Sequence, residues 1–200
     1  EDCFFVAMDS SGNFSWAERI GSEYWDTANG ISYDLQGNMF FTGSTCQNIN
    51  FEDNTSNSVV DIFTNIYVNK YGPSGNIVFS KILGGVNDDN VAGIVADSRG
   101  NYFIAGVNSS MAILDTIQVA KPGAFLAKFN PTGQIQWVKT IPGVRVRAKA
   151  VDSDSKGNIY ITGEYQDTIT LGDSVYVNQS YQDLFYVMYD STGKIKWANT

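Results

Sequence analysis

The feature that most constrains this chain is an internal repeat with a period of about 60 residues. A glycine followed four residues later by a large aromatic residue occurs four times, at Gly12, Gly75, Gly133 and Gly193, with intervals of 63, 58 and 60 residues. A second pattern, in which Asp stands three residues before a Gly-Asn pair and a glycine closes the run, occupies residues 30–43, 93–106 and 150–163. Repetition at a fixed period indicates one small structural unit that stacks against its neighbours.

Each of the two patterns predicts a β-hairpin. Runs such as FFVAM, AFLAKF and NIYITG are rich in aromatic and β-branched residues, and Asp, Asn or Ser followed by Gly separates them. The glycine supplies the positive φ that such a turn requires, and the Asp side chain bonds to its own backbone. Two hairpins per period give four antiparallel strands, and no segment has the periodicity of a long amphipathic helix.

The repeat also predicts the architecture. A four-stranded sheet cannot bury both faces alone, so the copies must stack; radial stacking gives a β-propeller, and an antiparallel solenoid is the alternative. The register divides residues 1–200 into a half blade at 1–20, which holds only the third and fourth strands, and full blades at 28–82, 91–141 and 148–200. We therefore predict an all-β fold: one partial β-propeller of about three and a half four-stranded antiparallel blades.

A partial ring leaves open strand edges. We therefore expect the chain to be a fragment of a larger protein, with the rest of its own propeller or a larger assembly as a partner.

Composition narrows the classes of function. The 200 residues include no His, which removes the commonest general base at neutral pH, the Ser/His and Cys/His triads and most catalytic zinc sites. The 13 Lys and Arg against 21 Asp and Glu give a net charge of −8, and there is no basic stripe, so nucleic acid is not an expected partner. No apolar run approaches the roughly 18–20 residues of a membrane-spanning helix, so no transmembrane segment is expected.

Loop lengths select a candidate binding surface. The connections between second and third strands, at 44–61, 107–122 and 164–183, lie on the same face as those between consecutive blades, and this long-loop face contrasts with the tight turns opposite. The connections between blades place eight candidate ligand-binding residues there, namely Tyr24, Trp25, Asp26, Asn87, Asp88, Asp89, Arg145 and Arg147. Exposed aromatic residues beside carboxamides and carboxylates suit a glycan or a peptide. The structural alternative is that Asp26 and Asp89 bond the turns and that the two arginines are solvated.

Two further groups of residues suggest chemistry. Asp152 and Asp154, in the sequence DSDSKGN, begin like a calcium-binding loop but lack the distant Glu of an EF-hand, so an ordinary turn competes with calcium as the explanation. No other cofactor is expected. Cys3 and Cys46 should lie near the same face in adjacent blades, where they form either a disulfide or two separate buried thiols.

The pairing of Gly-Ile-x-x-Asp-x-x-Gly-Asn-x-x-x-x-Gly with a later x-G-x-x-x-W hairpin resembles the bacterial seven-bladed β-propeller repeats known as SBBP repeats. The resemblance covers nearly the whole chain, although residues 150–151 read Ala-Val in place of Gly-Ile. It implies a bacterial protein that is secreted or associated with the outer membrane and cell surface, with type IX secretion as one such route.

We therefore expect a non-enzymatic, extracellular or cell-surface scaffold that binds a protein or a glycan through its long-loop face. The alternative is a polysaccharide lyase or hydrolase in which carboxylates such as Asp88 and Asp89 act with a metal on the same face.

Overall fold

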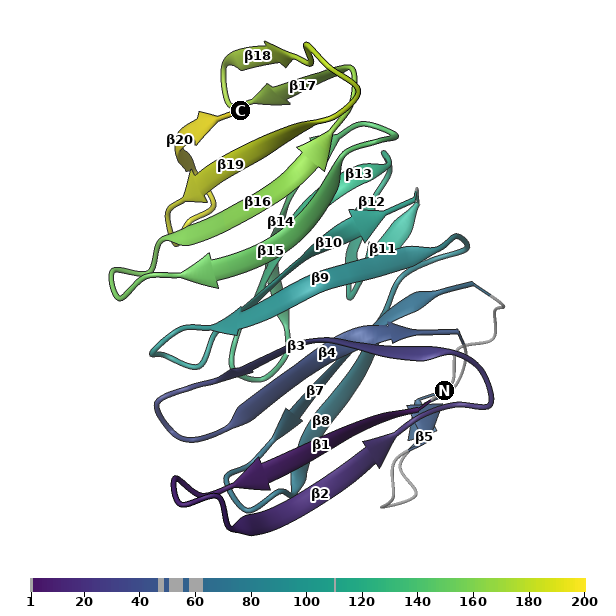
Figure 1. Ribbon diagram of the computed structural model, residues 1–200, viewed down its shortest axis with the longest axis vertical. Helices are drawn as coiled ribbons and strands as arrows, with labels where there is room; N and C mark the ends of the chain where they lie inside the picture. The colour runs from purple at the N-terminus through teal and green to yellow at the C-terminus, as the bar shows by residue number, and fades with distance from the viewer. Residues whose placement is uncertain (1, 47–48, 51–55, 58–62, 110) are drawn as a thin grey trace.

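The computed structural model describes residues 2–46, 49–50, 56–57, 63–109 and 111–200, and within these ranges it consists of strands and turns without a helix. An N-terminal hairpin pairs β1 (Cys3–Met8) with β2 (Phe14–Ile20). Three four-stranded antiparallel sheets follow, each a meander in chain order (Figure 1). Their strands are β3 (Asp26–Tyr33), β4 (Met39–Thr45), β7 (Asn65–Tyr71) and β8 (Ile77–Leu83) in the first blade, β9 (Asp89–Ala96), β10 (Tyr102–Asn108), β13 (Gly123–Phe129) and β14 (Ile135–Pro142) in the second, and β15 (Arg147–Ser153), β16 (Ile159–Tyr165), β19 (Asp183–Tyr189) and β20 (Ile195–Asn199) in the third.

The turn between β3 and β4 shows how the repeated Asp and Gly make each hairpin. Asp34 Oδ1 accepts hydrogen bonds from the backbone N–H groups of Gln36 and Asn38, at 3.0 and 2.9 Å, and Oδ2 accepts one from Asn38 Nδ2 at 2.7 Å. Gly37 has a φ of 79°, which a residue with a side chain rarely adopts. The same bonds recur at Asp9, Asp97 and Asp154, with Asn13, Asn101 and Asn158 as donors. The predicted roles of the turn residues are confirmed.

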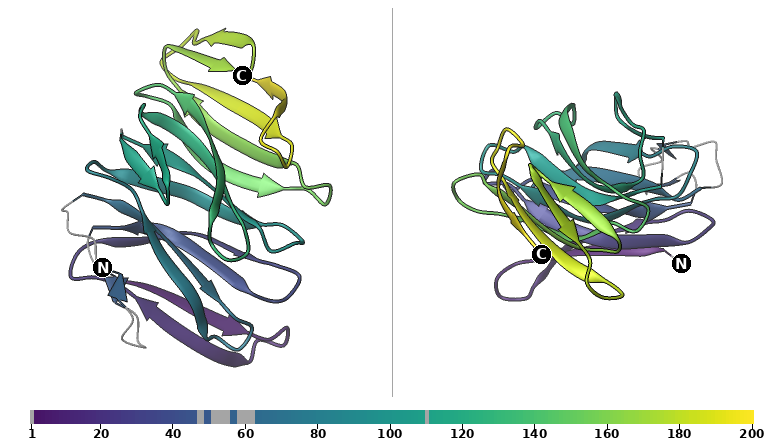
Figure 2. Two further views of the ribbon diagram at one scale, coloured as in Figure 1. Left: turned by 180° about the vertical axis from the view of Figure 1, so that it is seen from behind. Right: turned by 90° about the horizontal axis from the view of Figure 1, so that it is seen from above.

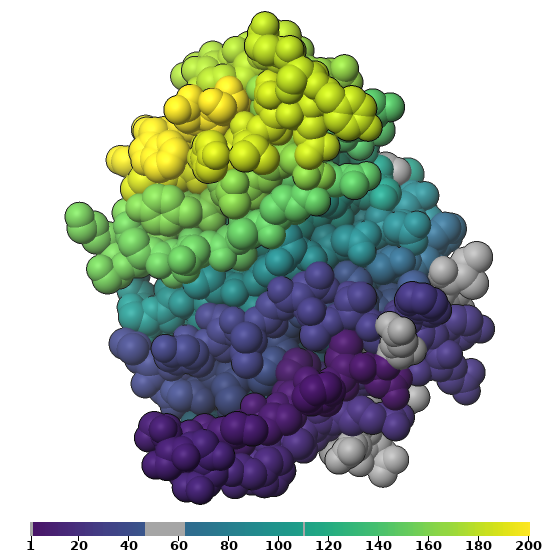
Figure 3. Space-filling view, viewed as in Figure 1, coloured from purple at the N-terminus to yellow at the C-terminus, as the bar shows by residue number. Residues whose placement is uncertain are grey.

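The sheets stack face to face, and the hydrophobic core lies between them. β9 packs against β3 and β4 of the first blade on one side and against β15 of the third on the other. One core cluster joins the first and second blades around Phe40 and Tyr102, and another joins the second and third around Phe103 and Phe185. Figures 2 and 3 show the blades as successive layers from the N-terminus to the C-terminus. The all-β fold and the partial β-propeller are thus confirmed, with β3, β9 and β15 as neighbouring inner strands.

Every inner strand carries a β-bulge at the same place. The pairing skips one residue between Ala28 and Gly30 in β3, and the equivalent skipped residues are Ala92 in β9 and Lys149 in β15. The bulge brings the inner strand close to the glycine that closes the repeat: a Cβ on Gly106 would lie 2.2 Å from the carbonyl oxygen of Asn90. A Cβ on Gly43 or on Gly163 would likewise clash with a backbone carbonyl of its own inner strand, that of Thr27 or of Arg147. These glycines are needed for close approach and not for an unusual φ.

The connections between second and third strands differ from the expected long binding loops. They contain small hairpins, of which β11 (Ala112–Leu114) with β12 (Ile117–Val119) and β17 (Thr168–Leu171) with β18 (Ser174–Val177) are described with their side chains, while β5 (Ile49–Asn50) pairs with β6 (Ser56–Asn57). Leu114 and Leu171 are buried in the cores between blades, and β11 also bridges to the preceding blade through Gly84 and Ile113. The sequence predicted 107–122 and 164–183 only as long connections; the structure adds that each contains a hairpin whose alternating apolar residues pack into the core between blades.

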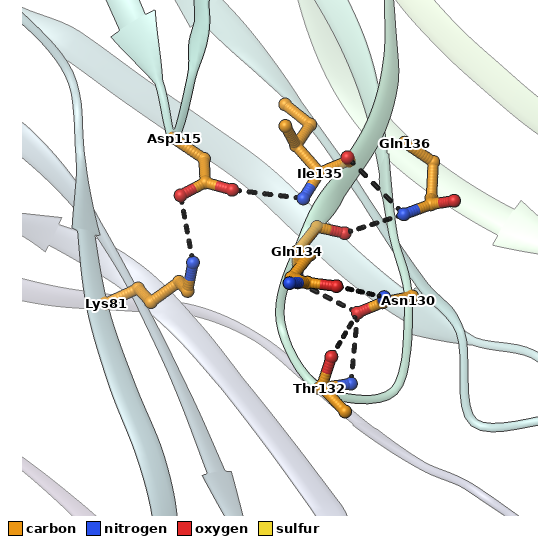
Figure 4. A network of polar contacts seen from close by, with 7 residues as sticks. All are labelled: Lys81, Asp115, Asn130, Thr132, Gln134, Ile135 and Gln136. Carbon is orange, nitrogen blue, oxygen red and sulfur yellow. Dashed lines mark hydrogen bonds and ion pairs between the residues drawn. The ribbon is translucent and has the colours of Figure 1, made fainter.

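Asp115, in the turn of the β11–β12 hairpin, fixes this hairpin to two blades (Figure 4). Its Oδ1 forms a 3.0 Å ion pair with Lys81 Nζ of β8, and its Oδ2 accepts the N–H of Ile135 in β14 at 3.1 Å. Burial raises the pKa of Asp115, but the bonds from Ile135 and Lys81 outweigh burial and leave the pKa below its ordinary value. The hairpin is therefore a tie between blades.

Candidate binding site at the start of the inner strands

The starts of β3, β9 and β15 lie side by side on the long-loop face, and their pairing registers match. We call residues 24–27, 87–90 and 144–147 the rim. Each of these three ranges leads into an inner strand, and the three ranges match position by position. Thr27, Asn90 and Arg147 are equivalent, since they pair with Ser44, Val107 and Glu164 respectively. The preceding equivalent positions hold Asp26, Asp89 and Val146, and before them stand Trp25, Asp88 and Arg145.

Asp26 and Asp89 are buried, and each carboxylate accepts a hydrogen bond from a neighbouring segment of the chain. Asp26 accepts the N–H of Ser22 at 2.7 Å and also the Ser22 hydroxyl. Asp89 is fully buried, and its Oδ1 accepts the N–H of Ser109 at 3.1 Å. These contacts agree with the structural explanation of the two carboxylates.

The third blade replaces this buried carboxylate with Val146. The Val146 side chain is 1% exposed and belongs to the core between the second and third blades. Its N–H bonds to the carbonyl of Gly143 in a tight turn. The rim of this blade is therefore anchored by apolar packing instead of by a carboxylate.

Asp88 and Asn87 belong to the connection that leads into β9. Asp88 Oδ1 accepts the N–H of Thr64 at 2.9 Å, and its carbonyl oxygen accepts the hydroxyl of Ser109. Asn87 is half-buried. Asp88 thus connects its blade to the segments that precede β7 and follow β10.

Tyr24 and Trp25 are the aromatic residues of the rim. Trp25 is 71% exposed and Tyr24 49%, and the Tyr24 N–H bonds to Ser22 Oγ at 3.0 Å. Large exposed aromatic surfaces on a structured turn are suited to contact a partner.

A polar cleft of about 440 Å³ crosses the three inner strands just inside the rim. Of the residues proposed from the sequence, only Arg147 lines it. The other residues that line the cleft are Asn29, Asn90, Val91, Ala92, Val107, Ser109, Ala148 and Lys149. All three bulge residues, Asn29, Ala92 and Lys149, are among them. A bulge redirects a side chain, so the repeated bulges account for the lining that the sequence pattern missed.

The charged groups around the cleft come from the third blade. Lys149 Nζ pairs with Glu164 Oε1 at 3.0 Å, and Glu164 Oε2 accepts a hydrogen bond from Gln182 Nε2 at 2.8 Å. Arg145 bonds to the neutral Gln166 at 2.6 Å. Arg147 is exposed, and it forms no ion pair with a carboxylate of the described part of the chain, although Glu164 is its cross-strand neighbour. The cleft therefore carries an arginine whose guanidinium is available to a ligand.

A second cleft, of about 660 Å³, lies on the opposite face among the tight turns of the inner strands. Tyr33, Arg99, Lys128 and Lys156 contribute to its lining, and Lys128 Nζ bonds to the carbonyl of Ser191 at 3.0 Å. The loop lengths do not predict this cleft, because short turns of three adjacent blades enclose the space together.

The two carboxylates proposed for calcium have separate surroundings. Asp154 is engaged by its own turn and by the Tyr160 hydroxyl at 3.0 Å, and hydrogen bonding, first from the Asn158 side chain, lowers its pKa to about 2. Asp152 accepts the N–H of Ser153. Within the described ranges no three Cys, Asp or Glu residues form a group that would hold a metal ion. The geometry around Asp154 is that of an Asx turn.

Cys3 and Cys46 are free thiols in this structure. Cys3 is buried, and its burial raises the pKa of the thiol. Cys46 is half-buried, with Sγ 3.4 Å from Thr64 Oγ1. A disulfide between the two stays a prediction.

Comparison with known proteins shows a similarity to a repeat-containing protein. It is 27% identical over 159 residues to an uncharacterized WD repeat-containing protein of Acanthamoeba polyphaga mimivirus, and the match covers 69% of this chain and 11% of that protein. No family model matches the chain. A crystal structure of a protein of unknown function from Bacteroides caccae aligns over 98% of this chain and 92% of its own, at 12% identity and a TM-score of 0.30, which is too low to equate the folds. None of the described residues forms a helix long and apolar enough to cross a membrane.

Proposed function

We propose that this chain is a non-enzymatic binding scaffold that takes a protein or glycan partner at the rim and cleft of its long-loop face. The observation that supports the proposal best is the cleft itself: three rigid strands, each with a bulge, present amide, hydroxyl and cationic side chains into one opening. Rigid elements that hold polar groups in fixed positions are suited to recognition.

The surroundings of the rim carboxylates favour binding over catalysis. Asp88 and Asp89 bond to backbone N–H groups of Thr64 and Ser109. A carboxylate used to fix a loop is poorly placed to exchange a proton with a substrate. We place the protein in the extracellular or cell-surface class, as a member of the bacterial SBBP repeats and a candidate for type IX secretion, on the resemblance of the repeat alone.

The test is a panel of immobilised glycans probed with the chain, with the same glycans incubated in solution and analysed for cleavage. We expect retention of a subset without cleavage. The Trp25→Ala and Asn90→Ala variants should lose retention, whereas Val175→Ala, an exposed change on the β18 hairpin, should keep it. Cleavage that is abolished by Asp88→Ala would instead support the polysaccharide lyase or hydrolase.

A further inference from the structure

The positive charge in and beside the cleft comes from three residues of the third blade whose equivalents in the second blade are acidic or neutral. Where the second blade has Asp88, Asn90 and Ala92, the third has Arg145, Arg147 and Lys149. The chain as a whole carries a net charge of −8, with only 13 basic residues. Three cations within residues 145–149, where β15 begins, are therefore a local reversal of the overall charge.

Of these three cations, only Arg147 has neither an ion pair nor a side-chain hydrogen bond among the described contacts. Glu164 uses both carboxylate oxygens, one on Lys149 and one on Gln182. Arg145 is hydrogen-bonded to a neutral amide. Arg147 lines the cleft and forms no ion pair with a described carboxylate, because its cross-strand neighbour Glu164 is engaged by Lys149 and Gln182. A planar guanidinium in this situation favours a carboxylate that accepts two parallel hydrogen bonds.

The remaining lining distinguishes a sugar from a peptide. Asn29, Asn90 and Ser109 offer side-chain amides and a hydroxyl, which can both donate to and accept from ligand hydroxyl groups. An extended peptide would instead add to the free edge of an inner strand. The bulges at Asn29, Ala92 and Lys149 interrupt regular hydrogen bonding at this point of each strand.

We propose that the cleft binds an acidic glycan through a sugar carboxylate. The Arg147 guanidinium binds this carboxylate, and the side-chain amides of Asn29 and Asn90 bind hydroxyl groups of the sugar. This inference rests on the proposed binding function and assigns its ligand class. The sugar contributes the negative charge that the third-blade rim lacks.

The test compares oligogalacturonate with its methyl ester by titration calorimetry on the whole chain. Oligogalacturonate should bind, and the ester, which has the same hydroxyl groups but no charge, should bind at least about tenfold more weakly. Arg147→Gln should weaken oligogalacturonate binding by a similar factor, and Arg147→Lys should restore only part of it, because an ammonium cannot form the two parallel bonds. Arg99→Gln, which removes an exposed arginine from the opposite face, is the matched control and should leave the affinity unchanged.

The outcomes separate this inference from the proposed function. Equal binding of acid and ester, or an unchanged affinity in Arg147→Gln, overturns the carboxylate site, whereas retention of other glycans or proteins would leave the scaffold function standing. Displacement of oligogalacturonate by an equal concentration of acetate would show that the site takes a free anion, and it would also overturn the glycan assignment. Because Arg147 is exposed, circular dichroism of its variants should match the wild type.

Discussion

The second and third blades begin in opposite ways although their strands pair alike. β9 starts on the fully buried Asp89, whose carboxylate bonds to Ser109 N–H, whereas the equivalent Val146 beside β15 packs into the core. Both inner strands nevertheless have the same bulge and the same close approach to a glycine, Gly106 or Gly163. The comparison teaches that backbone geometry repeats and that the chemistry at the rim varies on top of it.

The largest loss of stability is expected at the glycine that occupies the same position in both blades, Gly106 in the second and Gly163 in the third. A Cβ on Gly106 would lie 2.2 Å from the Asn90 carbonyl oxygen and 2.9 Å from the Phe125 ring, so Gly106→Ala should destabilise the fold by more than about 3 kcal/mol. Gly93→Ala in the neighbouring strand is the control, because its Cβ would meet only Val151 Cγ1 at 3.5 Å. Chemical denaturation of both variants measures the difference, and equal midpoints would show that the bulge is not what requires glycine.

The next largest effect is expected when Val146 of the third blade is replaced by Asp, the residue that the second blade has at the equivalent position. Val146→Asp introduces a carboxylate into an apolar core and should cost between about 2 and 3 kcal/mol at neutral pH. Burial raises the pKa of such a carboxyl, so the folded variant binds a proton more readily than the unfolded chain. The loss should therefore be smallest and constant below about pH 4, and it should grow as pH rises above that value.

The reciprocal change completes that pair. Asp89→Val leaves the Ser109 N–H without its acceptor and should cost about 2 kcal/mol. Chemical denaturation at several pH values measures both variants. A Val146→Asp loss that does not grow with pH, or a wild-type midpoint for Asp89→Val at neutral pH, would contradict the respective prediction.

The sequence predicts well what depends on local backbone chemistry. The turn at Asp34, Gly37 and Asn38 is recognisable because each residue type has one role, and the repetition of Gly43, Gly106 and Gly163 reveals the strands that contain them. The cleft was missed because Asn29 and Lys149 are the extra residues of bulges, which break the alternation used to assign faces. The hairpins at Leu114 and Leu171 were missed because their burial depends on a neighbouring blade.

A smaller contrast between the same blades concerns equivalent residues of their third strands, β13 and β19, and the contact that one of them makes with the next blade. Lys128 of β13 lies 5.4 Å from the centre of the Phe103 ring and donates to the carbonyl of Ser191 in the third blade, whereas the equivalent residue of β19 is Met188. Lys128→Met removes the hydrogen bond and the cation–π contact and should cost about 1 kcal/mol. Thermal unfolding measures the change, with Lys156→Met, an exposed turn residue, as the control. A midpoint equal to that of the control would remove Lys128 from the contacts that join blades.

The smallest predicted effect is confined to one turn. Asp154 accepts a hydrogen bond from Tyr160 in addition to those of its Asx turn, while the second blade has Phe103 where Tyr160 stands. Because the pKa of Asp154 is lowered to about 2, the stability it contributes is present above about pH 4 and is lost as pH falls toward 2.

Tyr160→Phe should raise the Asp154 pKa toward its ordinary value, but not fully, since the Asn158 side chain, the largest cause of the shift, remains. A carboxyl NMR titration measures this. Tyr176→Phe, which loses only a bond to the Ala198 carbonyl, should leave the pKa unchanged. If both variants titrate like the wild type, the Asx turn alone sets the pKa and the third turn is equivalent to the second.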